Sequence, residues 1–376
     1  MAAVHKVLVI GAGVAGVTTA TFLAQAGVSV RVIDTKDGVQ ALGSGITLQG
    51  NALRVLHDLG VWEQVREHGY SFDGVGIRAP GPQGQVVAEI PDARTGGPDL
   101  PGTCGVYRPD LARIVVGAAQ DAGVQLDYGL GFTDLGQDGE GVTVTFTDGT
   151  TDHYDLLVGA DGIRSQTRAA IGIDVTPRPT GMGIWRVFAP RPASVTRTDL
   201  FYGGPSYIAG YCPTGEDTLY AYLVEDYRPR PELTPEQQLQ HMVDLSGAYH
   251  GPWDDIRATM TDPSRINYTK FETHVVDGAW HRGRVVLVGD AAHSCPPTLA
   301  QGAAMALEDA AVLAEMLTGA DALTPQLLDA FAERRRPRAR MVVDASVQLG
   351  DWLLAHEQGD VPGLMDRVFA ELTNRP

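Results

Sequence analysis

At 376 residues, 44% of them hydrophobic, the chain is long enough for two domains or for one large domain with an insertion. Its net charge of −17 argues against nucleic acid and anionic membrane surfaces as partners. The three cysteines, Cys104, Cys212 and Cys295, are scattered and form no CxxC pair, so the sequence predicts neither a disulfide framework nor a metal site and favours a reducing, cytoplasmic setting.

The N-terminal segment predicts a strand, a glycine-rich turn, a helix and a second strand. The apolar runs over 7–10 and 28–33 are the strands, and the helix between them covers 17–26. The first strand begins too early to leave room for a signal peptide. No apolar run approaches the roughly 20 residues that span a bilayer, so we expect a soluble protein with no membrane partner.

The turn of this unit has the pattern GxGxxG, which is typical of dinucleotide-binding sites. Gly11 permits a tight bend, Gly13 lets the backbone approach a pyrophosphate, and Gly16 lets the helix pack closely on the strand. Asp34 ends the second strand, where a carboxylate accepts hydrogen bonds from a ribose diol and repels a 2′-phosphate. The unit predicts FAD or NAD, bound by Gly11, Gly13, Val14, Ala15, Gly16, Asp34, Thr35 and Lys36.

The first half of the chain continues with alternating helix and strand patterns. The spacing predicts helices over 51–59 and 110–122 and strands over 124–128, 142–146 and 156–159. Between them, residues 73–103 are rich in Gly, Pro and Asp. This composition indicates short strands and loops, or an excursion toward a second domain.

Alternating aromatic and polar residues over 180–270 predict an antiparallel sheet, with a helix over 235–245. A strand over 284–288 and an alanine-rich helix over 301–317 follow, and on a later helix we expect the run Arg334-Arg335-Arg336 to face solvent. The chain thus divides into a nucleotide-binding domain, 1–72, 101–178 and 273–376, and a substrate domain, 73–100 and 179–272.

Two further motifs accompany the glycine-rich turn. Asp161-Gly162 follows the apolar strand over 156–159, with Arg164 and Arg168 close behind, and the segment from Gly289-Asp290 to Glu308-Asp309 follows the strand over 284–288. In this order the three motifs resemble those of the flavoprotein aromatic hydroxylases, the single-component group A monooxygenases typified by para-hydroxybenzoate hydroxylase. The resemblance covers nearly the whole chain. It implies an α/β fold: a Rossmann-like FAD-binding domain with an inserted antiparallel β-sheet substrate domain and C-terminal helices.

The resemblance also implies how the third motif holds FAD. Asp290 is expected to hydrogen-bond the ribityl chain, and a helix starting near Gly302 is expected to aim the N–H groups of Ala303 and Ala304 at the flavin pyrimidine, where a helix N-terminus stabilises negative charge. Family members usually have glycine where this chain has Ala300, so the extra methyl is expected to narrow the flavin or substrate side of the loop. The expected contacts here are Gly289, Asp290, Gly302, Ala303 and Ala304.

Other cofactor contacts follow from the same resemblance. Arg108 is expected against the flavin, where a cation stabilises the reduced form, and the loop over 43–49 is expected to bracket the isoalloxazine through Gly45, Ile46 and Gln49. For Gln49 a role at the start of the next helix is the alternative. Asp161 is expected to position the FAD-binding turn and to assist the nicotinamide. Arg164 and Arg168 either meet nicotinamide phosphates or are simply exposed.

The resemblance implies that NADH or NADPH reduces the flavin, and that the reduced flavin takes O2 to form a C4a-hydroperoxide that hydroxylates an electron-rich phenolic or N-heteroaromatic ring. Tyr220 and Tyr222 share one face of a predicted strand, and either of them, or Tyr207, is a candidate to bind the substrate or to start a proton relay. Packing is the alternative role for each tyrosine. Arg186 either binds an acidic substrate or the nicotinamide, or pairs with an acid at the domain boundary.

Two other functions use the same motifs. A natural-product tailoring or antibiotic-inactivating monooxygenase on a polycyclic substrate differs only in its cavity, and a non-catalytic flavin-binding regulator keeps the cofactor without the reaction. Substrate-stimulated oxidation of NAD(P)H separates an enzyme from a regulator. The sequence does not distinguish NADH from NADPH as the reductant, or a monomer from a homodimer.

Overall fold

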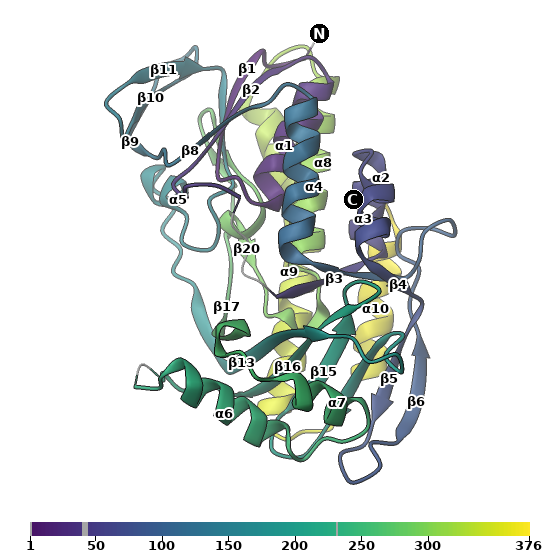
Figure 1. The fold of residues 1–376 in the computed structure, drawn as a ribbon. Coiled ribbons are helices and arrows are strands. Elements are labelled where there is room, and N and C mark those ends of the chain that lie inside the picture. Colours follow the sequence, from purple (N-terminus) through teal and green to yellow (C-terminus); the bar gives the residue numbers. More distant parts are fainter. Residues whose placement is uncertain (1, 40–43, 231) are drawn as a thin grey trace.

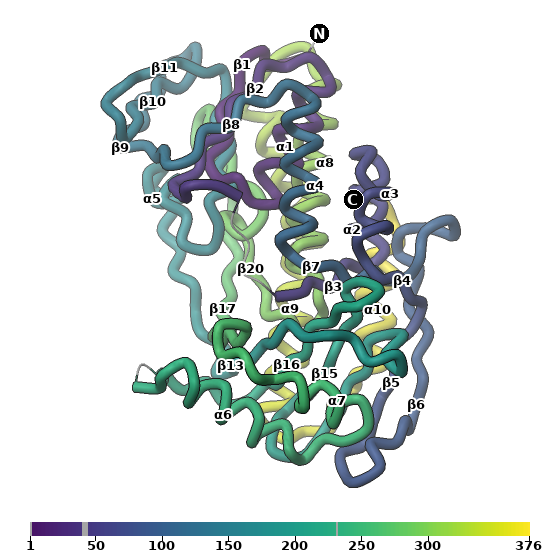
Figure 2. The backbone as a smooth tube through the Cα atoms, viewed as in Figure 1, coloured from purple at the N-terminus to yellow at the C-terminus, as the bar shows by residue number. Residues whose placement is uncertain are grey.

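A computed structural model describes residues 2–39, 44–230 and 232–376 of the chain. Gly43, the first residue of the loop predicted at the flavin, lies outside these ranges. Two sheets set one above the other dominate the molecule, and helices run along and between them (Figure 1). The tube in Figure 2 shows that the chain passes between the two layers several times.

The first layer is built on a six-stranded sheet of order β18-β19-β12-β1-β2-β8. All neighbours are parallel except the β18–β19 pair. Along β1 the side chains alternate between two cores: Val7 and Val9 face the helices, and Leu8 and Ile10 face a small three-stranded sheet. The strands are β1 (Lys6–Ile10), β2 (Ser29–Asp34), β8 (Gln125–Tyr128), β12 (Leu156–Gly159), β18 (His281–Arg282) and β19 (Val285–Leu287).

Three helices stand side by side against one face of this sheet (Figure 1): α1 (Val14–Gln25), α4 (Arg108–Asp121) and α8 (Gly302–Gly319). The small sheet that covers the other face consists of β9 (Phe132–Gln137), β10 (Val142–Phe146) and β11 (Thr151–Tyr154). α1 begins three residues earlier than predicted, directly after the glycine-rich turn, so its N-terminus lies at the end of β1.

The second layer is an eight-stranded sheet of order β20-β17-β13-β16-β15-β14-β5-β6. Every neighbouring pair is antiparallel except β14 and β5. Helices α6 (Pro235–Ser246) and α7 (Pro252–Thr259) lie along its outer face (Figure 1). The strands are β5 (Gly74–Arg78), β6 (Val86–Pro91), β13 (Arg178–Pro190), β14 (Thr198–Tyr202), β15 (Ile208–Pro213), β16 (Thr218–Asp226), β17 (Ile266–Val275) and β20 (His293–Ser294). The predicted fold class is confirmed.

Shorter elements join the two layers: strands β3 (Gly45–Gln49), β4 (Tyr70–Phe72) and β7 (Thr103–Tyr107), helices α2 (Gly50–Asp58), α3 (Trp62–His68) and α5 (Gln166–Ala170), and single 3₁₀ turns η1 (Pro263–Arg265), η2 (Gly289–Ala291) and η3 (Pro297–Leu299). The long helix α9 (Pro325–Leu354) runs from one layer to the other, and α10 (Val361–Thr373) packs beside it (Figure 1). Among the described residues, no helix is both long and apolar enough to cross a membrane.

The arginine run on α9 corrects one expectation. Arg334 and Arg336 are partly or fully exposed, but Arg335 between them is completely buried. α9 also continues through Pro337, where a helix would ordinarily end or kink. The burial of Arg335 comes from the packing of α9 against α8, which the sequence pattern of one helix does not reveal.

Candidate active site

The glycine-rich turn forms a cradle with one open side. Gly11 has φ +107°, and a Cβ there would lie 2.4 Å from the carbonyl oxygen of Ala160. A Cβ on Gly16 would lie 2.0 Å from the carbonyl oxygen of Gly11, whereas a Cβ on Gly13 would meet no atom within 4 Å. The first N–H bonded within α1 is that of Val17, which donates to the carbonyl of Gly13, so the preceding N–H groups stay available to an anion. The turn therefore fits a pyrophosphate.

Asp34 lies at the carboxyl end of β2, beside this turn. One of its carboxylate oxygens accepts the backbone N–H of Ala12 at 2.9 Å, and the other accepts the N–H of Lys36, also at 2.9 Å. The carboxylate thus fixes the turn and the start of the following loop. Thr35 and Lys36 lie at the surface next to it and do not line the cavity described below.

A cavity of about 670 Å³ lies between the two layers. Of the predicted cofactor residues, Gly13, Val14, Ala15, Gly45, Ile46, Gln49, Arg108, Asp290, Gly302 and Ala303 line it, together with the substrate candidates Arg186, Tyr220 and Tyr222. Gly11, Gly16, Gly289 and Ala304 lie behind this lining. Residues from segments far apart in the chain thus share one cavity.

Asp290 and Arg108 provide the charge on the cofactor side of the cavity. The carboxyl of Asp290, on η2, faces the cavity but is otherwise surrounded by protein, and this burial raises its pKa against the opposing effect of His293 and Arg108. Burial also lowers the pKa of the Arg108 guanidinium. Both residues are accessible from the cavity, so an acid and a base are available there to a polar group of a bound ligand.

The N-terminus of α8 points at the same side of the cavity. The N–H of Met305 donates to the carbonyl of Gln301, so the N–H groups of Gly302, Ala303 and Ala304 have no partner within the helix. Gln49 is tied into this region: its amide donates to the carbonyl of Leu299 at 2.9 Å, and its oxygen accepts from the side chain of Gln301. The side chain of Gln49 therefore joins β3 to the loop before α8 as well as lining the cavity.

Asp161 and the arginines that follow it support the site from outside the cavity. The carboxylate of Asp161 accepts the hydroxyl of Ser165 and the N–H of Thr167, which fixes the turn into α5. Arg168 is buried and donates to the carbonyl of Ala291 at 2.9 Å, so it holds η2 and is neither exposed nor open to a phosphate. Arg164 is exposed and forms an ion pair with Glu272 at 2.7 Å.

Tyr220, Tyr222 and Arg186 meet on the inner face of the large sheet. Arg186 on β13 pairs in register with Tyr222 on β16, and the rings of Tyr220 and Tyr222 stack at 5.3 Å. Burial, and after it the like charge of Arg108, lowers the pKa of Arg186 to about 10. Burial raises the pKa of both tyrosines, so their hydroxyls stay protonated at neutral pH. Among the described residues, no carboxylate pairs with Arg186, which donates to the hydroxyl of Thr269 at 2.7 Å.

Tyr207 lies away from this group. Its hydroxyl donates to Asp226 at 2.6 Å, and its ring lines a second, outer cavity instead of the one with Arg186. The reason is the sheet pleat and register, because Ile208, the next residue, pairs with Val224 and takes the inward position. The substrate role predicted for Tyr207 therefore has no support in its placement.

Sequence reasoning missed two inward-facing residues. Thr47 on β3 has its hydroxyl 2.8 Å from that of Tyr220, and Tyr202 ends β14 at the edge of the cavity. The close approach of β3 depends on Gly45, since a Cβ there would lie 2.0 Å from the ring of Tyr220. Thr47 stood within the predicted flavin loop, but only long-range packing shows that it meets Tyr220.

A buried ionic network lies behind the cofactor side of the cavity. Glu308 and Asp309 on α8 face Arg335 and Arg338 on α9: Arg335 contacts the two carboxylates at 2.9 and 2.8 Å, and Arg338 contacts Glu308 at 2.8 Å. Burial alone would raise the pKa of Asp309, but His293 and Arg335 outweigh it and hold that pKa below its usual value. Asp309 also accepts the N–H of Gly289 at 2.8 Å, so the network fixes η2.

The sequence profile of the FAD binding domain family matches residues 5–346, which takes in the turn at Gly11, the segment at Asp161 and η2. The chain belongs to this family of FAD-dependent monooxygenases. It is an enzyme of the hydroxylase type, as predicted, and the alternative of a non-catalytic regulator is not supported.

This FAD-dependent monooxygenase has relatives of similar length. It is 31% identical over 94% of the chain to a putative FAD-dependent monooxygenase, YetM, of Bacillus subtilis, and covers 95% of that protein. It is 29% identical over 94% of the chain to 6-hydroxynicotinate 3-monooxygenase of Pseudomonas fluorescens, with 92% of that protein covered. The solved structure of 2-methyl-3-hydroxypyridine-5-carboxylic acid oxygenase superposes with a TM-score of 0.78 at 28% identity, over 94% of this chain and 91% of that one.

Proposed function

We propose that the enzyme uses NAD(P)H and O2 to hydroxylate a hydroxy-substituted aromatic or N-heteroaromatic acid. The observation that carries this proposal is Arg186, a desolvated cation with no acid partner among the described residues, which faces the cavity beside two aromatic rings. A buried unpaired charge is costly, so a site that keeps one is suited to a ligand of opposite charge. The rings of Tyr220 and Tyr222 suit a planar ligand.

Two of the relatives support this substrate class, whereas others are named for a quinolone. Both 6-hydroxynicotinate and 2-methyl-3-hydroxypyridine-5-carboxylic acid, named for two of them, are hydroxypyridines that carry a carboxyl group. In our proposal the carboxylate of the substrate pairs with Arg186, and its ring lies against Tyr222. This places the ring between the large sheet and the cofactor side of the cavity.

The residues of this chain hold the cofactor and move a proton. We assign the pyrophosphate to the turn at Gly13, the ribityl chain to Asp290, and the flavin pyrimidine to the N-terminus of α8. When bound, FAD supplies electron transfer from NAD(P)H and the activation of O2. Tyr220 is neutral because burial raises its pKa, and its hydroxyl donates a hydrogen bond to the substrate hydroxyl. The hydroxyl of Thr47, which lies within hydrogen-bond distance, can pass a proton to or from that of Tyr220.

The test is oxidation of NADH and NADPH by the FAD-loaded enzyme with matched pairs of compounds. We expect 6-hydroxynicotinate and 4-hydroxybenzoate to stimulate it, with one oxygen atom added to the ring and the carboxyl group either kept or released as CO2, and their analogues without the carboxyl group, 2-hydroxypyridine and phenol, to do so far less. A 4-quinolone tests the polycyclic alternative. Turnover of the quinolone or of the neutral analogues alone would refute the acid class.

Replacing Arg186 with methionine should separate activity from stability. We expect kcat/KM for the acid to fall about 100-fold, since a buried ion pair to the substrate is lost. The lowered pKa of Arg186 means that the folded state disfavours the charged guanidinium, so at neutral pH its removal should stabilise the substrate-free protein by about 1–3 kcal/mol. Steady-state kinetics and urea unfolding measure the two effects.

Arg178→Met is the matched control, because Arg178 is exposed on the same strand and does not line the cavity. It should change neither quantity. A loss of stability in Arg186→Met comparable to the loss of a core residue would show that Arg186 is a structural group and would remove the basis of the proposal.

A further inference from the structure

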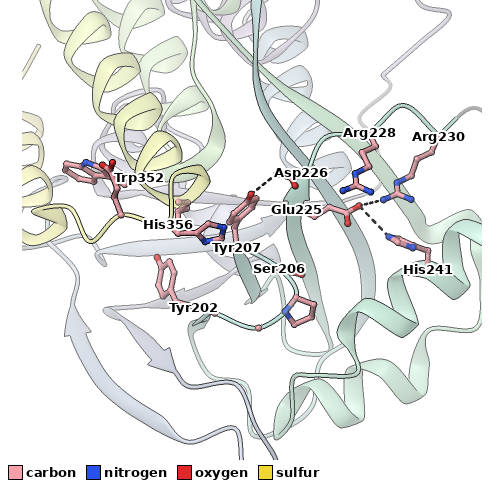
Figure 3. Close-up of a pocket in the computed structure, with 15 residues that line it drawn as sticks. Tyr202, Ser206, Tyr207, Glu225, Asp226, Arg228, Arg230, His241, Trp352 and His356 are labelled. Carbon is pink, nitrogen blue, oxygen red and sulfur yellow. Dashed lines mark hydrogen bonds and ion pairs between the residues drawn. The ribbon is translucent and has the colours of Figure 1, made fainter.

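A second cavity, of about 540 Å³, lies where the ends of β14, β15 and β16 meet the end of α9. We call this cavity the vestibule. Figure 3 shows its aromatic side chains: Tyr202 and Tyr207 from the sheet, and Trp352 and His356 from the α9 end. The rings of Tyr207 and His356 lie 5.8 Å apart. Of the charged groups around it, Glu225 binds Arg230 at 2.8 Å, and Asp226 accepts the hydroxyl of Tyr207.

Tyr202 is the wall that the vestibule shares with the active-site cavity, because its side chain lines both. The strand register places Tyr202 beside Ile208, and Ile208 beside Val224, as one row across the sheet. All three line the active-site cavity, and the residues next to Ile208 and Val224 along the chain, Tyr207 and Glu225, line the vestibule. The same three strands therefore run from one cavity into the other.

The ring of Tyr202 is not fixed by a hydrogen bond among the described residues. It is 41% exposed, and its hydroxyl makes no hydrogen bond to any residue within 2–39, 44–230 or 232–376. Gly203 and Gly204 follow it with φ of +89° and +88°. By contrast, Tyr207 is fixed by its 2.6 Å hydrogen bond to Asp226. Of these two tyrosines, the one without a hydrogen bond among the described residues is thus Tyr202, whose ring separates the two cavities.

We propose that the vestibule is the route by which a planar aromatic substrate reaches the flavin, and that the ring of Tyr202 is its gate. This inference rests on the proposed function only for the class of ligand. Four aromatic rings make the vestibule a surface for stacking, and the glycine pair after Tyr202 lets the ring turn aside.

The active-site cavity also reaches the surface beside Lys270 on β17. In the sheet order, β17 and β14 are separated by β13, β16 and β15, so the two openings lie at opposite sides of the cavity. Lys270 therefore offers a matched control for an obstruction placed at the other opening.

The probe is N-phenylmaleimide, a planar aromatic thiol reagent, applied to the FAD-loaded enzyme carrying Leu200→Cys. Leu200 lines the active-site cavity on the same strand as Tyr202. Cys104 and Cys212 are buried, so Cys295 is the native cysteine that can also react, and peptide mass mapping distinguishes its labelling from that of position 200. The labelling rate at position 200 is compared in four backgrounds: Tyr202→Ala, Tyr202→Trp, Tyr202→Phe and Lys270→Trp.

We expect labelling about tenfold faster with Tyr202→Ala, because the ring that closes the passage is removed. We expect it about tenfold slower with Tyr202→Trp, because the larger ring obstructs the passage. Tyr202→Phe and Lys270→Trp should leave the rate unchanged. A labelling rate that falls with Lys270→Trp, or that does not change with Tyr202→Trp, would overturn the proposal. If Tyr202→Ala fails to fold, the tryptophan and phenylalanine variants still decide it. Labelling needs no turnover, so the result stands apart from the assay of the proposed function.

Discussion

The Arg335→Met variant is expected to unfold about 3–5 kcal/mol more easily than the parent chain. Arg335 is completely buried between Glu308 and Asp309, with contacts of 2.9 and 2.8 Å. Methionine fills most of the volume of the arginine but leaves the carboxylates of Glu308 and Asp309 with too little positive charge around them. A substitution that leaves a buried charge uncompensated is among the most destabilising single changes.

Urea unfolding of the FAD-free protein measures this effect. Arg334→Met, a neighbour on the same helix whose side chain is one-third exposed, is the control and should shift the free energy of unfolding by no more than about 0.5 kcal/mol. Adding Asp309→Asn to Arg335→Met should recover part of the loss, because it removes one of the stranded charges. Equal stability of the two arginine variants would show that the network does not hold α8 to α9.

Gly13→Ala is expected to lower FAD affinity about 100-fold while leaving the FAD-free protein as stable as the parent. A Cβ at Gly13 meets no protein atom within 4 Å, and the backbone there is extended with φ −75°, so alanine fits the protein itself. The methyl would project into the space that we assign to the pyrophosphate. The loss of affinity therefore reports on the cofactor and not on folding.

Gly16→Ala gives the opposite pattern and serves as the comparison. Its Cβ would lie 2.0 Å from the carbonyl oxygen of Gly11, so the fold itself should be destabilised. Flavin fluorescence titration and urea unfolding together distinguish the two variants. If Gly13→Ala binds FAD as the parent does, the pyrophosphate does not lie over this turn, and our assignment of the cofactor fails.

The sequence predicted well where one local signal sufficed. The strands at 142–146 and 156–159 were placed at their observed bounds, because buried β residues alternate or run apolar between turn residues. The glycine-rich turn was recognised because its spacing reflects a single local geometry. Most residues predicted to contact FAD or substrate line one cavity, although their individual roles stay predictions.

The errors arose where distant segments decide the outcome. Arg335 looked like its neighbours in an arginine run, and only the packing of α8 on α9 shows that it is buried. Tyr207 and Tyr202 are both tyrosines near strand ends, and the register between strands, not their local pattern, determines which one reaches the cavity. Thr47 acquires its partner Tyr220 from a strand more than a hundred residues away.

Ala300 shows a feature that the sequence did not predict. The resemblance implied a glycine at this position in the family, and the expectation was only that the extra methyl narrows the loop. The structure places Ala300 on the cavity wall with φ +53°, a left-handed conformation that costs a non-glycine residue about 1–2 kcal/mol. The departure therefore strains the backbone in addition to filling space.

The buried ionic network behind the cofactor site also depends on a segment near residue 371, which is translated late. Arg338 donates to the carbonyl of Glu371 at 2.6 Å, and Arg54 donates to those of Thr373 and Asn374, both at 3.1 Å. The motif that fixes η2 is thus complete only after residues 371–374 have been translated. Until that segment has been made and has packed beside α9, Arg338 and Arg54 lack these carbonyl partners, so we expect the support behind η2 to form late in folding.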